Sequence, residues 1–127
     1  MRKPMPFHHR RLASISRFTG EDARELHALV EAAEGRRCRD ADPEAFFPPD
    51  GMRFSREALA VERDRVEGLC RGCPVRQECL ASALLRGETY GSWGGVAQPD
   101  FQVLARLWRE QKQDAVLVED PVEQEVA

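Results

Sequence analysis

Apolar residues recur with the three-to-four-residue period of an amphipathic helix in four stretches of the chain, and strand content looks minimal. The first predicted helix begins at Thr19, with Asp22 as the acid of a weak capping box, and ends at Gly35. The others are predicted over residues 55–70, 75–85 and 98–113. This pattern predicts an all-α fold, a small domain of four helices.

The segments outside this pattern are predicted to be irregular. Residues 1–18 mix Pro, His, Arg and Ser without a sustained period, which indicates a flexible basic N-terminal arm with solvated histidines. Residues 114–127 are acidic and have little to fold with, which predicts a disordered tail. The ordered part is therefore expected to be a domain over residues 19–97, followed by a C-terminal helix over 98–113.

Composition indicates that the chain can bury only a modest core. Leu, Ile, Val and Phe make up 28 of the 127 residues, about 22%, just above the level below which a charged chain is read as disordered. The net charge of −3 combines a basic beginning with an acidic end, so it implies no general affinity for nucleic acid. No apolar run resembles a secretory signal or a membrane span, so a soluble, cytoplasmic protein is expected.

The four cysteines are the strongest chemical signal. Their spacing is Cys38-x31-Cys70-x2-Cys73-x5-Cys79, and in a reducing compartment this favours metal ligation or redox chemistry over structural disulfides. The C-x2-C pair lets two thiolates converge on one metal, and Cys79 follows about one and a half helical turns later. Four thiolates suit tetrahedral zinc or an iron–sulfur cluster, and the spacing leaves both open. Either group would staple a small domain together.

A further interpretation treats Cys70 and Cys73 as a thiol–disulfide redox pair. Pro74 starts a helix directly after them, and a helix N-terminus lowers a thiol pKa. The βαβ pattern expected around a thioredoxin-like motif is absent, and no nucleotide loop or acid–base constellation is recognisable. The chain is therefore not expected to be an enzyme.

Two further motifs complete a family pattern. With the segment Asp42-Pro43-Glu44-Ala45-Phe46-Phe47-Pro48 and the turn Gly91-Ser92-Trp93-Gly94-Gly95, the cysteines make residues 36–97 resemble the WhiB-like proteins of actinobacteria. The resemblance implies that the domain over residues 19–97 wraps one [4Fe–4S] cluster per monomer with Cys38, Cys70, Cys73 and Cys79. It also implies a transcription regulator that responds to oxygen or nitric oxide, and whose thiols can form disulfides once the cluster is lost.

The resemblance also implies a protein partner, region 4 of the principal sigma factor of RNA polymerase. Carried over, Phe46, Phe47 and Trp93 are the contacts, with Gly94 and Gly95 allowing close backbone approach. Trp93 stands among glycines that offer it few local neighbours, so it must pack on the cluster core or on a partner. The alternative is that the three aromatic residues only shield the cluster from water.

The chain departs from the family pattern at three places. Ser92 stands where the family usually has Ile or Val, and no tryptophan precedes Cys38. The basic segment after the glycine turn is reduced to Arg106, Arg109 and Lys112, without an RGRP motif. Direct contact with promoter DNA would rest on these three residues, which neutralise few phosphates. The alternative is that the protein reaches promoter DNA through the RNA polymerase holoenzyme that contains the sigma factor.

Overall fold

The computed structural model describes residues 2–48 and 53–126, with only the backbone described over 115–126. These residues form five α-helices and three short 3₁₀ turns, and an isolated bridge between Trp93 and Val96 is their one β-pairing. The helices are α1 (Pro6–Ser14), α2 (Ala23–Ala32), α3 (Arg56–Cys70), α4 (Arg76–Leu85) and α5 (Gln98–Val126). The 3₁₀ turns are η1 (Ser16–Phe18), η2 (Arg37–Arg39) and η3 (Pro43–Phe46). The all-helical prediction is confirmed, but the number of helices is five rather than four.

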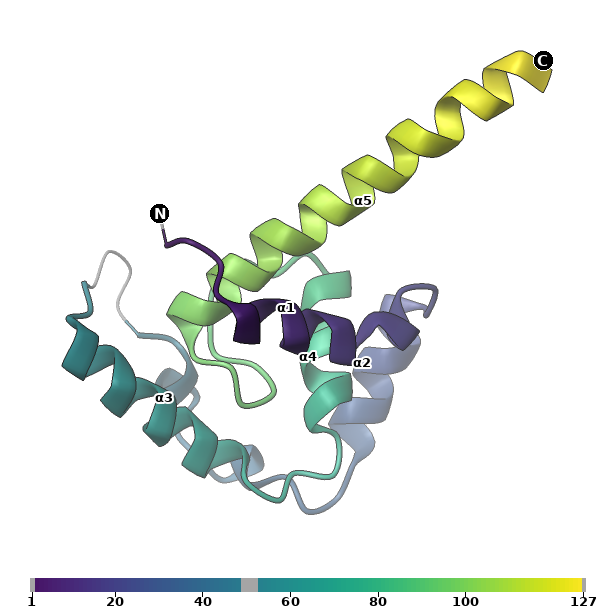
Figure 1. Cartoon of the computed structure of the whole chain (residues 1–127). Coiled ribbons are helices and arrows are strands. Elements are labelled where there is room, and N and C mark those ends of the chain that lie inside the picture. Colours follow the sequence, from purple (N-terminus) through teal and green to yellow (C-terminus); the bar gives the residue numbers. More distant parts are fainter. Residues whose placement is uncertain (1, 49–52, 127) are drawn as a thin grey trace.

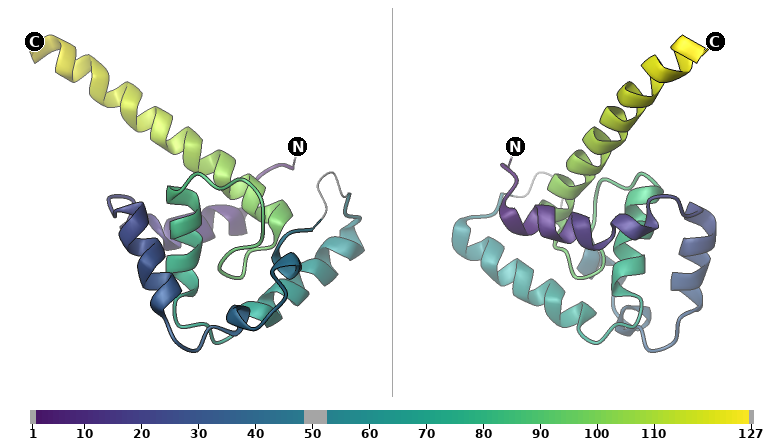
Figure 2. Two further views of the ribbon diagram at one scale, coloured as in Figure 1. Left: turned by 180° about the vertical axis from the view of Figure 1, so that it is seen from behind. Right: turned by 45° about the vertical axis from the view of Figure 1, so that its right-hand side comes forward.

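The hydrophobic core lies between α1, α2, α4 and the first half of α5. Figures 1 and 2 show α2 and α4 side by side, α1 crossing the start of α5, and the rest of α5 projecting away from the molecule. The buried members of this cluster are Leu12, Ile15, Leu26, Leu80, Ala81, Ala83, Leu84, Val96, Phe101, Val103, Leu104, Ala105, Leu107 and Trp108. No helix in the described part of the chain has the length and apolar character of a membrane span.

Two of the helices, α2 and α3, begin after a residue whose side chain caps the helix N-terminus. Ser55 caps α3 as expected, because its hydroxyl accepts a hydrogen bond from the Ala58 amide at 3.1 Å. For α2 the expected start at Thr19 was wrong. Asp22 is itself the N-cap and accepts from the Glu25 amide at 3.0 Å, while Thr19 bonds back to the Ser16 carbonyl in η1. An ionised carboxylate in that position also interacts favourably with the helix dipole.

The N-terminal segment is not a flexible arm. Its residues 6–14 form α1, with Pro6 in the first turn, where a missing N–H is tolerated. His8, Leu12 and Ile15 share one face by their spacing and are buried in the core. His8 was expected to be solvated and is only 2% exposed. The predicted arm is therefore part of the folded domain.

The C-terminal helix is longer than expected. It begins at Gln98 and continues to Val126, so that most of the segment expected to be a disordered tail is helical. No glycine interrupts the chain beyond Gly95, and Ala, Leu, Gln and Glu, which favour helices, are frequent there. The packed part of α5 ends with Trp108, over whose ring the Lys112 ammonium lies at 5.5 Å.

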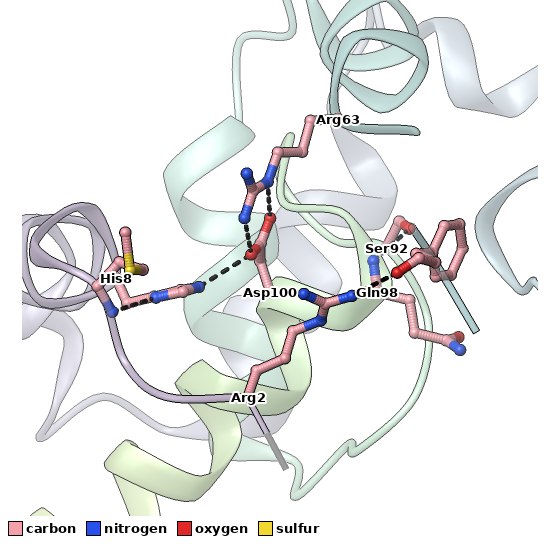
Figure 3. A network of polar contacts seen from close by, with 8 residues as sticks. Arg2, His8, Arg63, Ser92, Gln98 and Asp100 are labelled. Atoms are coloured by element: carbon pink, nitrogen blue, oxygen red, sulfur yellow. Dashed lines mark hydrogen bonds and ion pairs between the residues drawn. The ribbon is translucent and has the colours of Figure 1, made fainter. Parts of the chain in front are cut away.

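A buried polar network joins α1, α3 and α5 (Figure 3). The Asp100 carboxylate accepts two hydrogen bonds of 2.8 Å from Arg63, and His8 Nε2 lies 2.9 Å from its Oδ1. His8 Nδ1 accepts from the Met5 amide at 2.8 Å, which leaves Nε2 to carry the proton and donate to Asp100. The network thereby supplies polar partners for a carboxylate that is 3% exposed.

This network should weaken in acid. Burial opposes ionisation of Asp100, but hydrogen bonds from Arg63 and His8 offset it and hold the pKa of this carboxyl below its ordinary value. The unfolded chain takes up its proton near the ordinary pKa of about 3.9, so the stabilisation is complete above that pH and declines below it. Urea titrations should show the stability difference between wild type and Asp100→Asn narrowing from pH 7 to about pH 3. A difference that widens would contradict this assignment.

Helix α3 makes two ion pairs with the rest of the protein and lies beside the main hydrophobic cluster. Its buried residues Leu59, Val66 and Cys70 lie outside the main hydrophobic cluster. Arg63 pairs with Asp100, and its guanidinium lies 4.9 Å from the centroid of the Phe7 ring. Glu67 pairs with Arg76 at the start of α4. This places Cys70, at the end of α3, opposite α4.

Candidate metal centre

The four cysteines line one cavity of about 220 Å³. Cys38 comes from η2, Cys70 is the last residue of α3, Cys73 follows in a turn, and Cys79 lies in α4. All four are free thiols. The long segment between Cys38 and Cys70 contains η3 and α3 and brings the chain back beside η2.

Local geometry explains why the chain turns between Cys70 and Cys73. Gly72 has a φ of +77°, which L side chains rarely adopt, and the Cys73 amide donates to the Cys70 carbonyl at 3.1 Å. Two residues after Pro74, α4 begins, and the Cys79 amide donates to the Val75 carbonyl at 2.8 Å. On the other side of the cavity, Arg36 donates from Nη1 to the Cys38 sulfur at 3.7 Å.

Cys70 is buried and the other three cysteines are partly buried. The backbone amides of Gly95 and Gly94 favour the thiolate forms of Cys70 and Cys79, respectively. Burial nevertheless raises the pKa of the Cys79 thiol to about 11, and burial also raises the pKa of Cys70. Metal ligands must be thiolates, so binding at this place would release protons and offset the burial of charge.

The cysteine cavity is compatible with a metal group. Among the described residues, no three His, Cys, Asp or Glu side chains are grouped to hold one metal ion as the thiols stand. Four thiolates suit either tetrahedral zinc or an iron–sulfur cluster. Ser82, which is 1% exposed, also lines this cavity, and its hydroxyl has no hydrogen-bond partner among the described residues. Four thiols and an unpaired donor around one space fit an iron–sulfur cluster.

The aromatic residues form one wall of the same cavity. Phe46 is half-buried, Phe47 is 48% exposed, and the Phe47 ring meets the Trp93 ring edge-on with centroids 5.9 Å apart. Trp93 is partly buried against the hydrophobic core, and the Arg86 guanidinium lies 5.2 Å from its ring centroid. Phe47 is thus the more accessible member of this aromatic wall, which we define as Phe46, Phe47 and Trp93.

The glycine turn packs closely against α4. Gly94 lines the cysteine cavity, and its carbonyl accepts from Arg11 at 2.7 Å and from Arg76 at 3.2 Å. Gly95 lies on the other side of the turn, in a second cavity of about 280 Å³ near Arg76. Ser92 is buried, and its hydroxyl accepts from the Gln98 amide at 3.0 Å, at the start of α5. This serine therefore fastens the turn to α5.

The three basic residues of α5 are not near the cysteines. Arg106 is half-buried and donates to the Arg2 carbonyl at 2.9 Å, whereas Arg109 and Lys112 are exposed. None of the three lines the cysteine cavity. The structure thus separates this basic segment from the thiols and from the aromatic wall.

The geometry does not favour a redox pair at Cys70 and Cys73. Cys70 ends α3, so it lies at the negative end of a helix dipole rather than at a helix N-terminus. Burial raises the pKa of its thiol, whereas a reactive thiol needs a lowered one. This arrangement opposes the thiol–disulfide reductase interpretation.

Sequence reasoning missed several residues that shape the site. Ser82 lies three residues after Cys79 on a helix, and this spacing alone places the two side chains on one face. Arg36 lies two residues before Cys38. Because it is a hydrogen-bond donor so close in sequence to a candidate ligand, it could have been predicted to contact the site. Arg11 and Arg76 reach Gly94 from other elements, and no local pattern predicts that contact.

Comparison with known proteins identifies the family. The model of a family described as Transcription factor WhiB matches residues 33–103, more than half of the chain. The redox-responsive transcriptional regulator WhiB3 of Mycolicibacterium smegmatis is 41% identical over 69 residues, which cover 54% of this chain and 70% of that protein. The transcriptional regulator WhiD of Streptomyces coelicolor is 36% identical over 93 residues, 73% of this chain and 78% of WhiD.

A third relative, the transcriptional regulator WhiB1 of Mycobacterium tuberculosis, is 44% identical over 69 residues, 54% of this chain and 77% of that protein. No solved structure matches the chain. The matched region contains all four cysteines, the aromatic wall and the glycine turn, while α1 lies before it. The chain belongs to the WhiB family.

Proposed function

We propose that this protein is a redox- and nitric-oxide-responsive transcription regulator that carries one [4Fe–4S] cluster per monomer. Cys38, Cys70, Cys73 and Cys79 would be its ligands, and the aromatic wall would bind region 4 of the principal sigma factor. When bound, the cluster supplies a group that reacts with oxygen and nitric oxide. Several relatives are named as transcriptional regulators, and WhiB3 as redox-responsive, which supports this role.

One observation carries the proposal: the thiols and the aromatic wall border the same cavity. The wall is also tied to the elements that bear the cysteines. The Ser92 amide donates to the Phe46 carbonyl at 2.7 Å, and Arg65 of α3 donates to the Ala45 carbonyl at 2.6 Å. If loss of the cluster shifts α3 and η2, these hydrogen bonds would transmit the shift to the aromatic wall through η3. The freed thiols could then oxidise to disulfides.

Promoter DNA would be reached chiefly through the holoenzyme. Arg106 is engaged by the N-terminal segment, which leaves Arg109 and Lys112 as the exposed cations on this part of α5. Two or three phosphate contacts would add a weak, salt-sensitive affinity for DNA without sequence preference.

Anaerobic purification with the sigma factor tests the cofactor. We expect four iron and about four sulfide per chain, and weaker sigma binding once the cluster is removed. Stoichiometric zinc without iron or sulfide would instead establish the structural zinc module. A cluster-free protein that binds sigma region 4 with undiminished affinity would exclude the switch. Turnover of a protein disulfide, lost in Cys70→Ser, would favour the reductase.

Phe47→Ala tests the aromatic wall. The side chain is half exposed, so its loss should leave folding and cluster loading intact, while a central aromatic anchor is worth about 2 kcal/mol. We expect the affinity for sigma region 4 to fall by about 30-fold, measured by calorimetry on cluster-loaded protein. Val61→Ala, on an exposed side chain of α3 outside the cavity, is the control and should bind normally. Equal affinities for both variants would contradict the assigned surface.

A further inference from the structure

Ser82 is a buried hydroxyl without an assigned purpose. Its residue is 1% exposed, and its Oγ is one of two buried side-chain polar atoms that lack a hydrogen-bond partner among the described residues. The other is Trp108 Nε1, which does not line the cysteine cavity. Leaving a buried hydroxyl unpaired destabilises the folded chain, so an unpaired group needs an explanation.

Ser82 lies next to a cysteine on α4 and belongs to the wall of the cysteine cavity. It follows Cys79 by three residues on α4, and both line the cavity with the other three thiols. A helical serine commonly bonds back to the carbonyl four residues earlier, but Ser82 makes no such bond. Much of the remaining cavity wall is apolar, including Val30, Leu69 and the aromatic wall.

The other donors around the cavity show the same preference. Arg36 donates to the sulfur of Cys38, and the amides of Gly94 and Gly95 partly offset the effect of burial on the pKa of the Cys79 and Cys70 thiols. A cluster bound by four thiolates is anionic and presents sulfur acceptors to its surroundings. Ser82 is the donor of this set that still lacks an acceptor.

We propose that the Ser82 hydroxyl donates a hydrogen bond to a sulfur atom of the bound [4Fe–4S] cluster and thereby raises its reduction potential. The inference rests on the proposed cluster. A donor aimed at sulfur stabilises the reduced state more than the oxidised state, because reduction adds negative charge to the cluster. Ser82 is thus a residue that sets how readily the cluster is reduced or oxidised.

Redox titration of the cluster-loaded protein tests this inference. With dithionite as reductant and electron paramagnetic resonance as readout, Ser82→Ala should lower the midpoint potential. The ratio of reduced to oxidised cluster at a fixed potential should fall by about fivefold, the size expected for one hydrogen bond of about 1 kcal/mol. Ser82→Thr retains the hydroxyl and should restore the wild-type potential. Ser14→Ala, which removes an exposed serine, should leave the potential unchanged.

A second pair of variants guards against failure of the alanine variant to load a cluster. Thr and Val at position 82 have nearly the same shape and differ by the hydroxyl, so Ser82→Thr should have the higher potential of the two. Equal potentials in Ser82→Thr and Ser82→Val, or in wild type and Ser82→Ala, would overturn the inference while leaving the cluster established. Absence of iron and sulfide from wild type would instead overturn the proposed function.

Discussion

Gly94→Ala is expected to lower the free energy of unfolding by more than about 3 kcal/mol, at the upper end of single substitutions. A Cβ at this position would overlap the Arg76 carbonyl oxygen and would lie 2.9 Å from the Cβ of Leu80. Both neighbours belong to the packed start of α4, and the residue has a φ of +55°, so the clash cannot be relieved by a side-chain rotation. Either α4 or the glycine turn must move.

Urea denaturation of the cluster-free protein measures this effect, with Gly68→Ala as the matched control. Gly68 lies inside α3 with no atom within 4 Å of an added Cβ. Alanine there should stabilise the chain by about 1 kcal/mol, because glycine is the poorer helix former. The same chemical change should thus have opposite signs at the two positions. A Gly94→Ala variant within about 1 kcal/mol of wild type would show that the turn is not closely packed.

Asp100→Ala should cost about 3 kcal/mol, since removing one partner of a buried charged pair leaves the others uncompensated. His8 would remain buried without its acceptor, while Arg63, whose side chain is 40% exposed, can turn toward water. The loss should therefore be smaller than for a fully buried ion pair. Thermal or urea unfolding at neutral pH measures it.

The control for Asp100→Ala is Asp64→Ala. Asp64 is exposed on α3 next to Arg63, so its substitution removes the same charge without breaking the network. We expect a change within about 0.5 kcal/mol. A double-mutant cycle between His8→Ala and Asp100→Ala should show coupling of at least about 0.5 kcal/mol. Additive effects would mean that the hydrogen bond between the two side chains does not contribute to stability.

Sequence periodicity predicted α3 and α4 closely and the start, but not the end, of α5. Ser55 is the N-cap of α3 as expected, whereas α4 begins at Arg76, two residues after Pro74, so Pro74 is not its first residue. The first helix was missed because its charged and proline-rich composition hid the spacing of His8, Leu12 and Ile15. His8 is buried against Asp100, which lies 92 positions away in the sequence. Such a contact depends on the tertiary structure and cannot be predicted from a local sequence pattern.

The candidate site was predictable in its residues and not in its arrangement. Cysteine spacing and the aromatic pair identified several of the residues that line the cysteine cavity. Some of the contacts that support them come from elements distant in sequence, such as the bond from Arg11 on α1 to Gly94. Ser92 departs from the family pattern, and its hydroxyl holds the start of α5. Polar contacts of this kind depend on the final backbone geometry.

We expect α3 to be a separate unit of local unfolding. Its buried residues Leu59 and Val66 lie outside the main hydrophobic cluster, so α3 should open at lower free energy than α4, whose apolar face belongs to that cluster. In the cluster-free protein, amide hydrogens of α3 should therefore exchange with solvent deuterium well before those of α4. Cofactor loss would then be reported as a local increase in exchange and protease cleavage, with the α1–α2–α4–α5 core still folded.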